Sequence, residues 1–287
     1  MYKVNKLTLK DSEFPEVLRN IPDPPKELYV LGNLEPLLQK PRLAVVGSRK
    51  VTPYGKLVTS QLAGQMAGKG VVIVSGLALG VDALAHQAAL DTHGLTIAVL
   101  ASGLDQISPT SNHHIARKIL ETGGAIVSEY PEGTPPIASN FIVRNRLVSG
   151  LSDGVLITEA AAKSGTMHTA NFALNQGRIV MAVPGNINSP LSEGTNNLIK
   201  TGAITITTAS DILQALGLNE SKARQTELFG NTKEETLLLT LLQSGITDAT
   251  VLLNQSNLEA AAFNQTLTML EISGKIYSLG ANHWSLK

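Results

Sequence analysis

The stretch that decides the fold reads Leu43-Ala44-Val45-Val46-Gly47-Ser48-Arg49, and a helix start follows at Thr52-Pro53. Its four apolar residues predict a buried parallel strand, which Gly47 and Ser48 end in a sharp turn. Thr52 is a good helix N-cap, and Pro53 suits the first helical position. This combination favours an anion, because free backbone N–H groups and the helix dipole face the turn. Arg49 adds a permanent cation beside it.

The same turn does not match two common nucleotide-binding fingerprints. The dinucleotide pattern G-x-G-x-x-G needs a glycine two residues after Gly47, where this chain has Arg49. The triphosphate loop ends in Gly-Lys-Ser/Thr, but Gly55-Lys56 lacks the hydroxyl residue and Lys163-Ser164 lacks the glycine. A tight turn that binds no ligand therefore stays open as an alternative at this point.

Length and composition indicate an ordered globular protein. The 287 residues allow one large α/β domain and a smaller one, and 43% of them are hydrophobic against 16% charged. No apolar run is long enough to span a bilayer, and residues 1–6 lack the apolar centre of a signal peptide. We therefore expect a cytoplasmic protein with no membrane partner. The absence of cysteine excludes disulfides, thiolate metal sites and thiol catalysis.

The net charge is zero, but the charges are unevenly distributed along the chain. Residues 40–216 carry 13 basic against 10 acidic side chains, whereas residues 1–39 carry 5 against 6 and residues 217–287 carry 5 against 7. A site for a polyanion is therefore expected in the middle segment, as a local patch and not as a general field.

The order of predicted elements divides the chain into four parts. Residues 1–40 contain five prolines and one short predicted strand at 28–31, and we expect them to form an N-terminal strap across the next domain. From 41 to 216, β-branched runs alternate with helical patterns, which predicts a doubly wound parallel sheet of the α/β class. Residues 217–231 are polar and aperiodic, and are predicted to be a linker. The predicted strands of the sheet are 43–46, 71–74, 96–100, 125–128, 154–158, 179–183 and 203–207.

The last part, residues 232–287, is predicted to be a small winged-helix domain. It contains helical patterns at 235–242, 248–254 and 258–272, and an alternating hairpin pattern at 274–286. The third helix of such a domain enters the groove of a DNA duplex. Here that helix carries Glu259 and Glu271 and no Lys or Arg. We therefore expect this domain to contact a protein and not a DNA duplex.

Small polar residues stand at the carboxyl ends of the predicted strands, where a doubly wound sheet binds its ligand. Serine and glycine allow close approach of a backbone and offer hydroxyls and amides, as a phosphate-bearing ligand requires. Short loops between strand and helix would also explain them. The strand ends are Gly47-Ser48-Arg49, Ser75-Gly76, Ala101-Ser102-Gly103, Ser128-Glu129, Thr158-Glu159 and Pro184-Gly185.

A second candidate region is the helix predicted over 141–148. Arg144, Asn145 and Arg146 cannot all share one face of a helix, so one arginine is expected to point inward. Phe141 stands at the helix start beside these cations, where it could stack a base while they hold phosphates. A core aromatic is the equally weighted alternative for Phe141.

The loop Lys163-Ser164-Gly165-Thr166 is a second anion-binding candidate, because it leads from a strand into a helix start. Thr166 is the predicted N-cap of that helix. Glu159, just before the loop, is a lone carboxylate, and we expect a structural role for it before an acid–base one. The pair His113-His114 has no metal-ligand spacing, so no metal and no cofactor are predicted.

Taken together, these motifs resemble the DNA-processing protein A family, DprA or Smf, over nearly the whole chain. The segments that carry the resemblance are Ile21–Pro25, Leu28–Leu34, Val45–Arg49, Ile73–Ala83, Ala98–Asp105, Ser128–Pro131, Asn140-Phe141 with Arg144–Arg146, Glu159-Ala160 with Lys163–Thr166, Val183–Gly185 and Gly194–Asn196. The resemblance implies a Rossmann-like domain that binds single-stranded DNA without sequence preference, protects incoming DNA and loads RecA recombinase during natural transformation. It also implies a homodimer through that domain and no enzymatic activity.

The resemblance also implies which residues line the DNA pocket. They are Gly47, Ser48, Arg49, Ser75, Gly76, Asn140, Phe141 and Lys163, to which the local patterns add Arg144, Arg146, Ser164, Gly165 and Thr166. Members of the family often carry a basic residue where this chain has Leu79, and another where it has Ala138-Ser139. The loss of two cations predicts a lower affinity or a different ligand path.

Two rival functions follow from the same residues. Related Rossmann-like nucleotide phosphoribohydrolases resemble a Pro-Gly-Gly-x-Gly-Thr-x-x-x-Glu pattern, whereas here the loop runs into Met167-His168-Thr169-Ala170 without a carboxylate. A nucleotide-binding or nucleotide-hydrolysing enzyme is therefore the alternative function. A duplex-binding regulator that uses the winged helix is the third, and the acidic balance of that domain argues against it.

Overall fold

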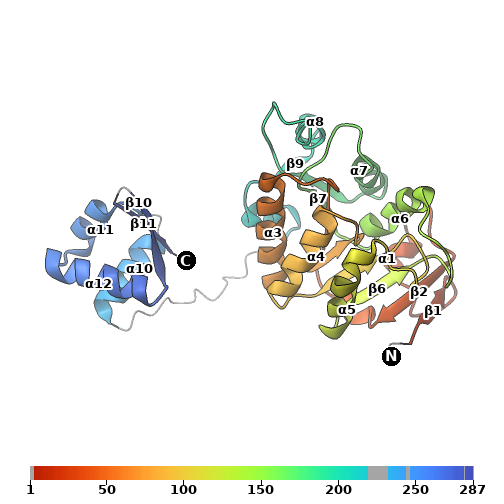
Figure 1. Cartoon of the computed structure of the whole chain (residues 1–287), viewed down its shortest axis with the longest axis horizontal. Coiled ribbons are helices and arrows are strands. Elements are labelled where there is room, and N and C mark those ends of the chain that lie inside the picture. Colours follow the sequence, from red (N-terminus) through yellow and green to blue (C-terminus); the bar gives the residue numbers. More distant parts are fainter. Residues whose placement is uncertain (1–2, 219–231, 244–245, 281, 287) are drawn as a thin grey trace. The chain divides into compact units, whose positions relative to one another are not determined.

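The computed structural model describes residues 3–218, 232–243, 246–280 and 282–286. The chain forms two compact units, Met1–Asn219 and Glu220–Lys287. Of the predicted linker, residues 219–231 lie outside the described residues. Figure 1 shows the helices and strands of both units.

One nine-stranded sheet organises the N-terminal unit (Figure 1). Its strand order is β1-β2-β6-β5-β4-β3-β7-β8-β9. The pairs β1–β2 and β2–β6 are antiparallel, and all the other neighbours pair in parallel. This confirms the predicted doubly wound α/β fold. The strands are β1 (Asn5–Thr8), β2 (Glu27–Gly32), β3 (Arg42–Val46), β4 (Val72–Ser75), β5 (Thr96–Val99), β6 (Ala125–Ser128), β7 (Gly154–Ile157), β8 (Ile179–Ala182) and β9 (Ile204–Thr205).

Helices cover both faces of this sheet because the central strands are apolar on both sides. Alternate residues of β3 show the division: Leu43 and Val45 face α3, α4 and α9, whereas Ala44 and Val46 face α1, α6, α7 and α8. The helices of this unit are α1 (Glu16–Arg19), α2 (Glu35–Leu38), α3 (Pro53–Gly68), α4 (Val81–Asp91), α5 (His113–Glu121), α6 (Ala138–Gly150), α7 (Thr166–Asn175), α8 (Glu193–Lys200) and α9 (Ala209–Ala215).

The course of the chain through the sheet reverses once, next to β3. From β3 it moves outward through β4, β5 and β6, and then α6 returns it to β7 on the other side of β3. Numbered in chain order from β3, the seven parallel strands have the order 4-3-2-1-5-6-7, which is the 3-2-1-4-5-6 order of a Rossmann fold with one more strand, β6, beyond β5. In such sheets the ligand crevice lies at the carboxyl ends of the two strands beside the reversal, which here are β3 and β7.

The N-terminal strap is part of the sheet. The predicted strand at 28–31 is confirmed within β2, which pairs with β6. The strand β1 was not predicted, and it extends the sheet by one further antiparallel pairing with β2. Phe14, Leu18 and Ile21, between the two strands, are buried in the core that α6 and α7 also share. The strap therefore closes one edge of the sheet and one end of its core.

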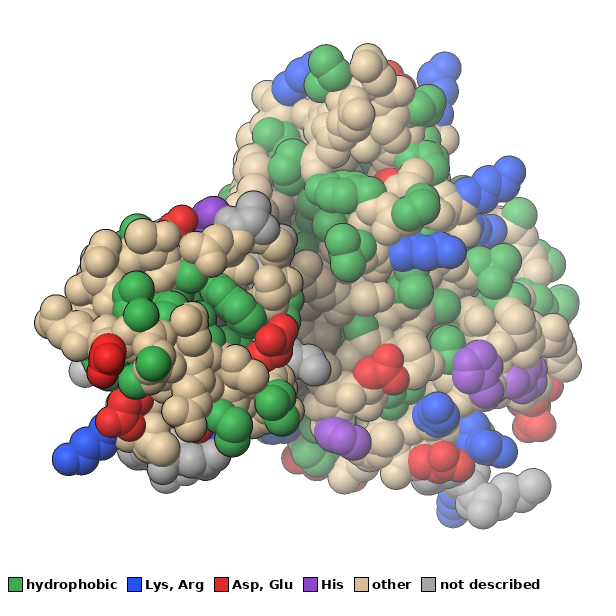
Figure 2. All heavy atoms as spheres, turned by 60° about the vertical axis from the view of Figure 1, so that its left-hand side comes forward, with side chains coloured by type: hydrophobic (Ala, Val, Ile, Leu, Met, Phe, Trp, Pro, Cys, Tyr) green, Lys and Arg blue, Asp and Glu red, His purple; other side chains and the backbone are tan. Residues whose placement is uncertain are grey.

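The C-terminal unit contains three helices and a hairpin among its described residues. They are α10 (Lys233–Gln243), α11 (Ala249–Ser256), α12 (Ala260–Ile272), β10 (Ile276–Gly280) and β11 (His283–Leu286). Leu238, Leu252, Phe263 and Leu270 form its core. Figure 2 shows hydrophobic side chains on the surface of this unit with acidic side chains beside them. The winged-helix assignment stays a prediction.

Neither a membrane span nor a metal site emerges from the described residues. No helix among them is both long and apolar enough to cross a bilayer. No group of three His, Cys, Asp or Glu side chains among them could hold a metal ion.

Candidate functional site

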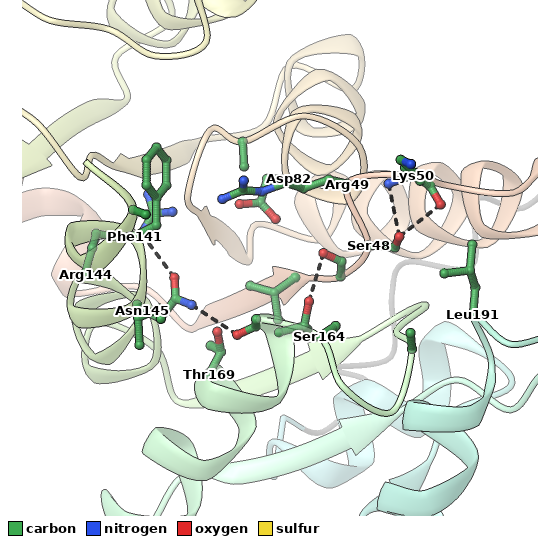
Figure 3. Close-up of a pocket in the computed structure, with 18 residues that line it drawn as sticks. Ser48, Arg49, Lys50, Asp82, Phe141, Arg144, Asn145, Ser164, Thr169 and Leu191 are labelled. Atoms are coloured by element: carbon green, nitrogen blue, oxygen red, sulfur yellow. Dashed lines mark hydrogen bonds between the residues drawn. The ribbon is translucent and has the colours of Figure 1, made fainter. Parts of the chain in front are cut away.

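A pocket of about 620 Å³ opens at the carboxyl ends of β3 and β7, where the topology predicts the ligand crevice (Figure 3). Most of its lining comes from three segments far apart in sequence: the turn after β3, the first turns of α6, and α7 with the loop before it. The lining residues are Val46, Gly47, Ser48, Arg49, Lys50, Ala78, Asp82, Ala138, Phe141, Ile142, Arg144, Asn145, Ala161, Ser164, Gly165, Thr166, Thr169 and Leu191.

The turn after β3 is held rigidly by its neighbours. A Cβ on Gly47 would lie 2.6 Å from Val81 Cγ2 and 2.7 Å from the Glu159 carbonyl oxygen, so only glycine fits there. The Ser48 backbone N–H donates to that same carbonyl over 2.7 Å. The Ser48 hydroxyl accepts from the Lys50 N–H and donates to the Lys50 carbonyl oxygen, at 3.1 and 2.9 Å. These bonds fix the backbone that presents Arg49.

The predicted N-cap of α3 is confirmed. Thr52 Oγ1 accepts from the Gly55 N–H at 3.0 Å, and Pro53 is the first helical residue. Glu159 completes this helix start, because its carboxylate accepts from the Thr52 N–H at 2.9 Å. The structural role expected for Glu159 agrees with its burial, since its side chain is 2% exposed.

The predicted N-cap of α7 is wrong. Gly165 takes that position and no side chain caps the helix. The Thr166 hydroxyl instead donates to the Gly47 carbonyl oxygen at 3.0 Å, which ties this loop to the turn after β3. Within the part of the chain that the structure describes, the backbone N–H groups of Ser164, Gly165 and Thr166 have no acceptor. The Ser164 hydroxyl is buried and also has no partner among those residues.

Arg144 forms the floor of the pocket. One inward-pointing arginine was predicted, and the structure buries both Arg144 and Arg146. The Arg144 side chain is almost fully buried, and Nη1 donates to the carbonyl oxygens of Gly76, at 2.7 Å, and Val99. A Cβ on Gly76 would lie 2.5 Å from the guanidinium, so glycine makes room for it. Burial lowers the pKa of Arg144 to about 10, against the opposing effect of the Asp82 carboxylate. The arginine therefore stays charged at neutral pH.

Asp82 is the counter-ion of this floor. Its carboxylate accepts from the Gly76 N–H at 3.1 Å, and it lies in the electrostatic field of both Arg144 and Arg49. Burial raises the pKa of Asp82, and the two arginines and the backbone donors act in the opposite direction. The pocket thus has two buried ionisable side chains, Arg144 and Asp82, and a more exposed cation, Arg49.

Phe141 lies in the pocket wall close to two guanidinium groups. The Cζ atoms of Arg49 and Arg144 are 5.0 and 5.8 Å from the centre of its ring. Both distances are within the range of cation–π attraction. The ring is partly exposed, so the core alternative for Phe141 does not hold. Figure 3 shows the ring standing at one side of the pocket and Asp82 facing the interior.

Several predicted site residues lie outside the pocket lining. Arg146 is buried in an ion pair with Glu129, at 2.7 Å, and its Nε donates to Asp23 at 2.8 Å. Ser75 is buried, and its hydroxyl donates to the Val45 carbonyl oxygen at 2.7 Å. Gly76 lies behind the Arg144 guanidinium. Asn140 and Lys163 are near the pocket but not among its lining residues, and Lys163 is exposed.

Sequence reasoning did not assign four polar lining residues to the site: Lys50, Asp82, Asn145 and Thr169. Asn145 links Arg144 to the loop before α7. Asn145 Oδ1 accepts from Arg144 Nε at 3.3 Å, and its Nδ2 donates to the Gly165 carbonyl oxygen at 3.5 Å. Asp82 lies in the first turn of α4, the helix that follows β4, and an acidic residue at that position is the signal that could have identified it.

The sequence model of the family described as DNA recombination-mediator protein A matches residues 5–217. The chain belongs to this family. The resemblance to DprA and Smf is thereby confirmed. Protein Smf from Escherichia coli is 49% identical over 207 residues, which cover 72% of this chain and 55% of Smf. The chain thus spans about half the length of that relative.

Two solved structures of DprA proteins have the same fold. The X-ray structure of DprA from Streptococcus pneumoniae is 39% identical, has a TM-score of 0.69 and covers 74% of each chain. DprA from Helicobacter pylori is 38% identical, has a TM-score of 0.67, and covers 75% of this chain and 96% of its own. The H. pylori structure is reported to give insight into a unique mode in which that protein binds single-stranded DNA.

Proposed function

We propose that the chain binds single-stranded DNA in this pocket, without sequence preference and without catalysing a reaction. The observation that carries the proposal is the meeting of three features in one pocket: the Arg49 guanidinium, the Phe141 ring and the uncapped start of α7. The binding mode described for the H. pylori relative supports the same class of ligand.

Each feature matches one part of a nucleotide. A phosphate at the start of α7 would accept hydrogen bonds from the free N–H groups of Ser164, Gly165 and Thr166, and from the Ser164 hydroxyl. Arg49 would hold a neighbouring phosphate with its fork of donors. A base would stack on Phe141, and stacking tolerates any sequence because every base has a π-face.

The lining residues do not favour the enzymatic alternative. Among the described residues that line the pocket, Asp82 is the one with a carboxylate. This carboxylate already accepts from the Gly76 N–H and interacts electrostatically with Arg144. The phosphoribohydrolase-like alternative needs a carboxylate that can reach the reacting atoms or a water. Asp82 fits better as a buried carboxylate whose charge favours the charged form of Arg144.

The wider role that we propose follows the family. The chain would protect incoming DNA and load RecA during natural transformation, in the cytoplasm; the family's description as a recombination mediator supports the part of this role that concerns recombination. A homodimer through the Rossmann-like unit is part of the same proposal. Light scattering of the full chain tests the dimer, and RecA activity on a strand pre-coated with single-strand-binding protein tests the loading. A monomer at all concentrations would contradict the dimer. No gain in RecA activity would contradict the loading of RecA.

The DNA ligand is tested by fluorescence anisotropy of labelled oligo-dT and of a matched duplex at two salt concentrations. We expect salt-sensitive binding of the single strand and much weaker binding of the duplex. Binding of free mononucleotides in preference to the strand would instead support the nucleotide-binding alternative.

In the same experiment, the variant Arg49→Ala tests whether the DNA binds in this pocket. Loss of one phosphate contact should weaken binding of every sequence alike and reduce the slope of log affinity against log salt by about 1. Lys69→Ala is the matched control, because Lys69 is an exposed cation at the far end of α3. Equal affinities and slopes for Arg49→Ala and the unchanged protein would show that DNA binds elsewhere.

A further inference from the structure

The start of α3 is the place where a Rossmann fold binds the phosphates of a dinucleotide. In that fold the pyrophosphate lies on the N-terminus of the helix that follows the first strand of the parallel sheet. The corresponding strand here is β3, and α3 is its helix. The question is whether the donors at this helix start are free to bind a ligand.

They are already occupied. The Thr52 N–H donates to Glu159 Oε2 at 2.9 Å, Pro53 has no N–H, and the Gly55 N–H donates to Thr52 Oγ1 at 3.0 Å. The Thr52 hydroxyl in turn donates to Glu159 Oε1 at 2.5 Å. Of the first donors of α3, only the Tyr54 N–H lacks an acceptor among the described residues.

The carboxylate of Glu159 fills the space as well as the bonds. The side chain is 2% exposed, and a Cβ on Gly55 would lie 2.6 Å from its Oε2. Burial and the nearby Glu159 charge together raise the pKa of Tyr54, which stands beside it on α3. A negative group of the protein thus lies where a ligand phosphate would have to lie.

The start of α7 is the opposite case. It has no side-chain cap, and three successive backbone N–H groups lack acceptors within the described part of the chain. The buried Ser164 hydroxyl, which has no partner there either, is a separate sign of an empty acceptor position. The two helix starts flank the same turn, because Thr166 donates to Gly47 and Ser48 donates to Glu159.

We infer that Glu159 is a specificity-determining residue: its carboxylate takes the phosphate position of α3, so that the site rejects a dinucleotide pyrophosphate and receives a phosphate at α7. The second half of this inference rests on the proposed function. The first half concerns α3 alone and can be measured without DNA.

The test removes the carboxylate and offers an anion in its place. Glu159→Ala is titrated with inorganic phosphate and with pyrophosphate at constant ionic strength, and its melting temperature is compared with that of the unchanged protein. We expect either anion to raise the Tm of Glu159→Ala by about 3 °C more than that of the unchanged protein, because it binds the vacated helix start. Equal shifts in both proteins would overturn the inference.

Glu159→Gln keeps the test valid if the alanine variant does not fold. The amide has nearly the same size and can still accept from the Thr52 N–H, but the negative charge is gone. Because the amide still occupies the helix start, only the part of the exclusion that comes from charge is lost. We expect the affinity for pyrophosphate, measured by calorimetry, to increase by about 3-fold, less than in a variant without the side chain. An unchanged or lower affinity would show that Glu159 only supports the loop. Oligo-dT binding by the unchanged protein is measured in parallel, so a failure of the proposed function is seen independently.

Discussion

At the scale of single residues, Phe141 decides whether the pocket recognises bases as well as phosphates. Its ring already lies 5.0 Å from the Arg49 Cζ, so an entering base would join or displace that cation–π contact. We predict that Phe141→Ala weakens oligo-dT binding by about 10-fold or more, because base–aromatic stacking contributes about 1–3 kcal/mol per base. Anisotropy at fixed salt measures the loss.

Two comparisons separate stacking from a general disturbance of the pocket. Phe141→Tyr keeps the π-face and should retain most of the affinity. The salt slope of Phe141→Ala should stay that of the unchanged protein, since no phosphate contact is lost. An alanine variant that binds as tightly as the tyrosine variant would rule out stacking on this ring.

His86 makes the stability of the N-terminal unit depend on pH. Its Nδ1 lies 2.7 Å from Thr96 Oγ1, which itself donates to the Ile73 carbonyl oxygen, so Nδ1 carries the proton. Its Nε2 is buried without a partner among the described residues. Burial, with a smaller effect of the Arg144 charge and against the opposing effect of the Ser75 backbone, lowers the pKa of His86 from 6.5 to about 3.

The direction of this pH dependence follows from proton binding. The unfolded chain binds a proton near pH 6.5 and the folded protein does not until about pH 3, so stability is lost as the pH falls through that window. The free energy of unfolding should fall by up to about 1.4 kcal/mol per pH unit from this group. Denaturant titrations of the unchanged protein and of His86→Gln measure it, with exposed His114→Gln as control. The same slope in all three proteins would exclude His86 as the cause.

At the scale of elements, the sequence correctly predicted the features that depend on neighbouring residues in the chain. The apolar run at 43–46, the turn at Gly47 and the Thr52 cap were correct because each depends on residues next to it in the chain. The Thr166 cap was wrong because its hydroxyl binds Gly47, 119 residues away, instead of its own helix. A tertiary partner outcompeted the local one, and no pattern in the sequence marks that partner.

The helix α6 shows a second limit of the same kind. Its helical pattern and its divergent arginines were predicted, but the roles of Arg144 and Arg146 depend on what packs against each of them. Arg144 meets strand ends and lies under the pocket, whereas Arg146 meets Glu129 and the strap residue Asp23. The strand β1 was missed because its four residues alternate too weakly to indicate a strand.

The start of α6 also allows a gain of affinity. Ala138 is exposed and lines the pocket at the first position of this helix. We predict that Ala138→Lys tightens oligo-dT binding by about 3-fold and increases the salt slope by about 1, because it adds a phosphate contact. Ala138→Gln is the neutral control of similar length. Tighter binding by both variants would point to packing and not to charge.

At the scale of the whole molecule, the proposed site lies entirely in the N-terminal unit. All residues that line the pocket belong to Met1–Asn219. The excess of basic residues also lies there, with 13 against 10 in residues 40–216, whereas residues 217–287 carry 5 basic against 7 acidic ones. The helix α12, which would enter a duplex in a winged helix, has no Lys or Arg.

We therefore predict that a chain ending at residue 218 binds oligo-dT with the affinity and salt slope of the full chain. The N-terminal unit has its own sheet and cores, so it should fold without the C-terminal unit. Anisotropy of both proteins at two salt concentrations measures the comparison. A shortened chain that folds but binds several-fold more weakly, with a smaller salt slope, would place phosphate contacts in residues 219–287. The net charge of that unit would then be a poor guide to its DNA binding. The next substitutions would be made at its few cations, first Lys233 and Lys275.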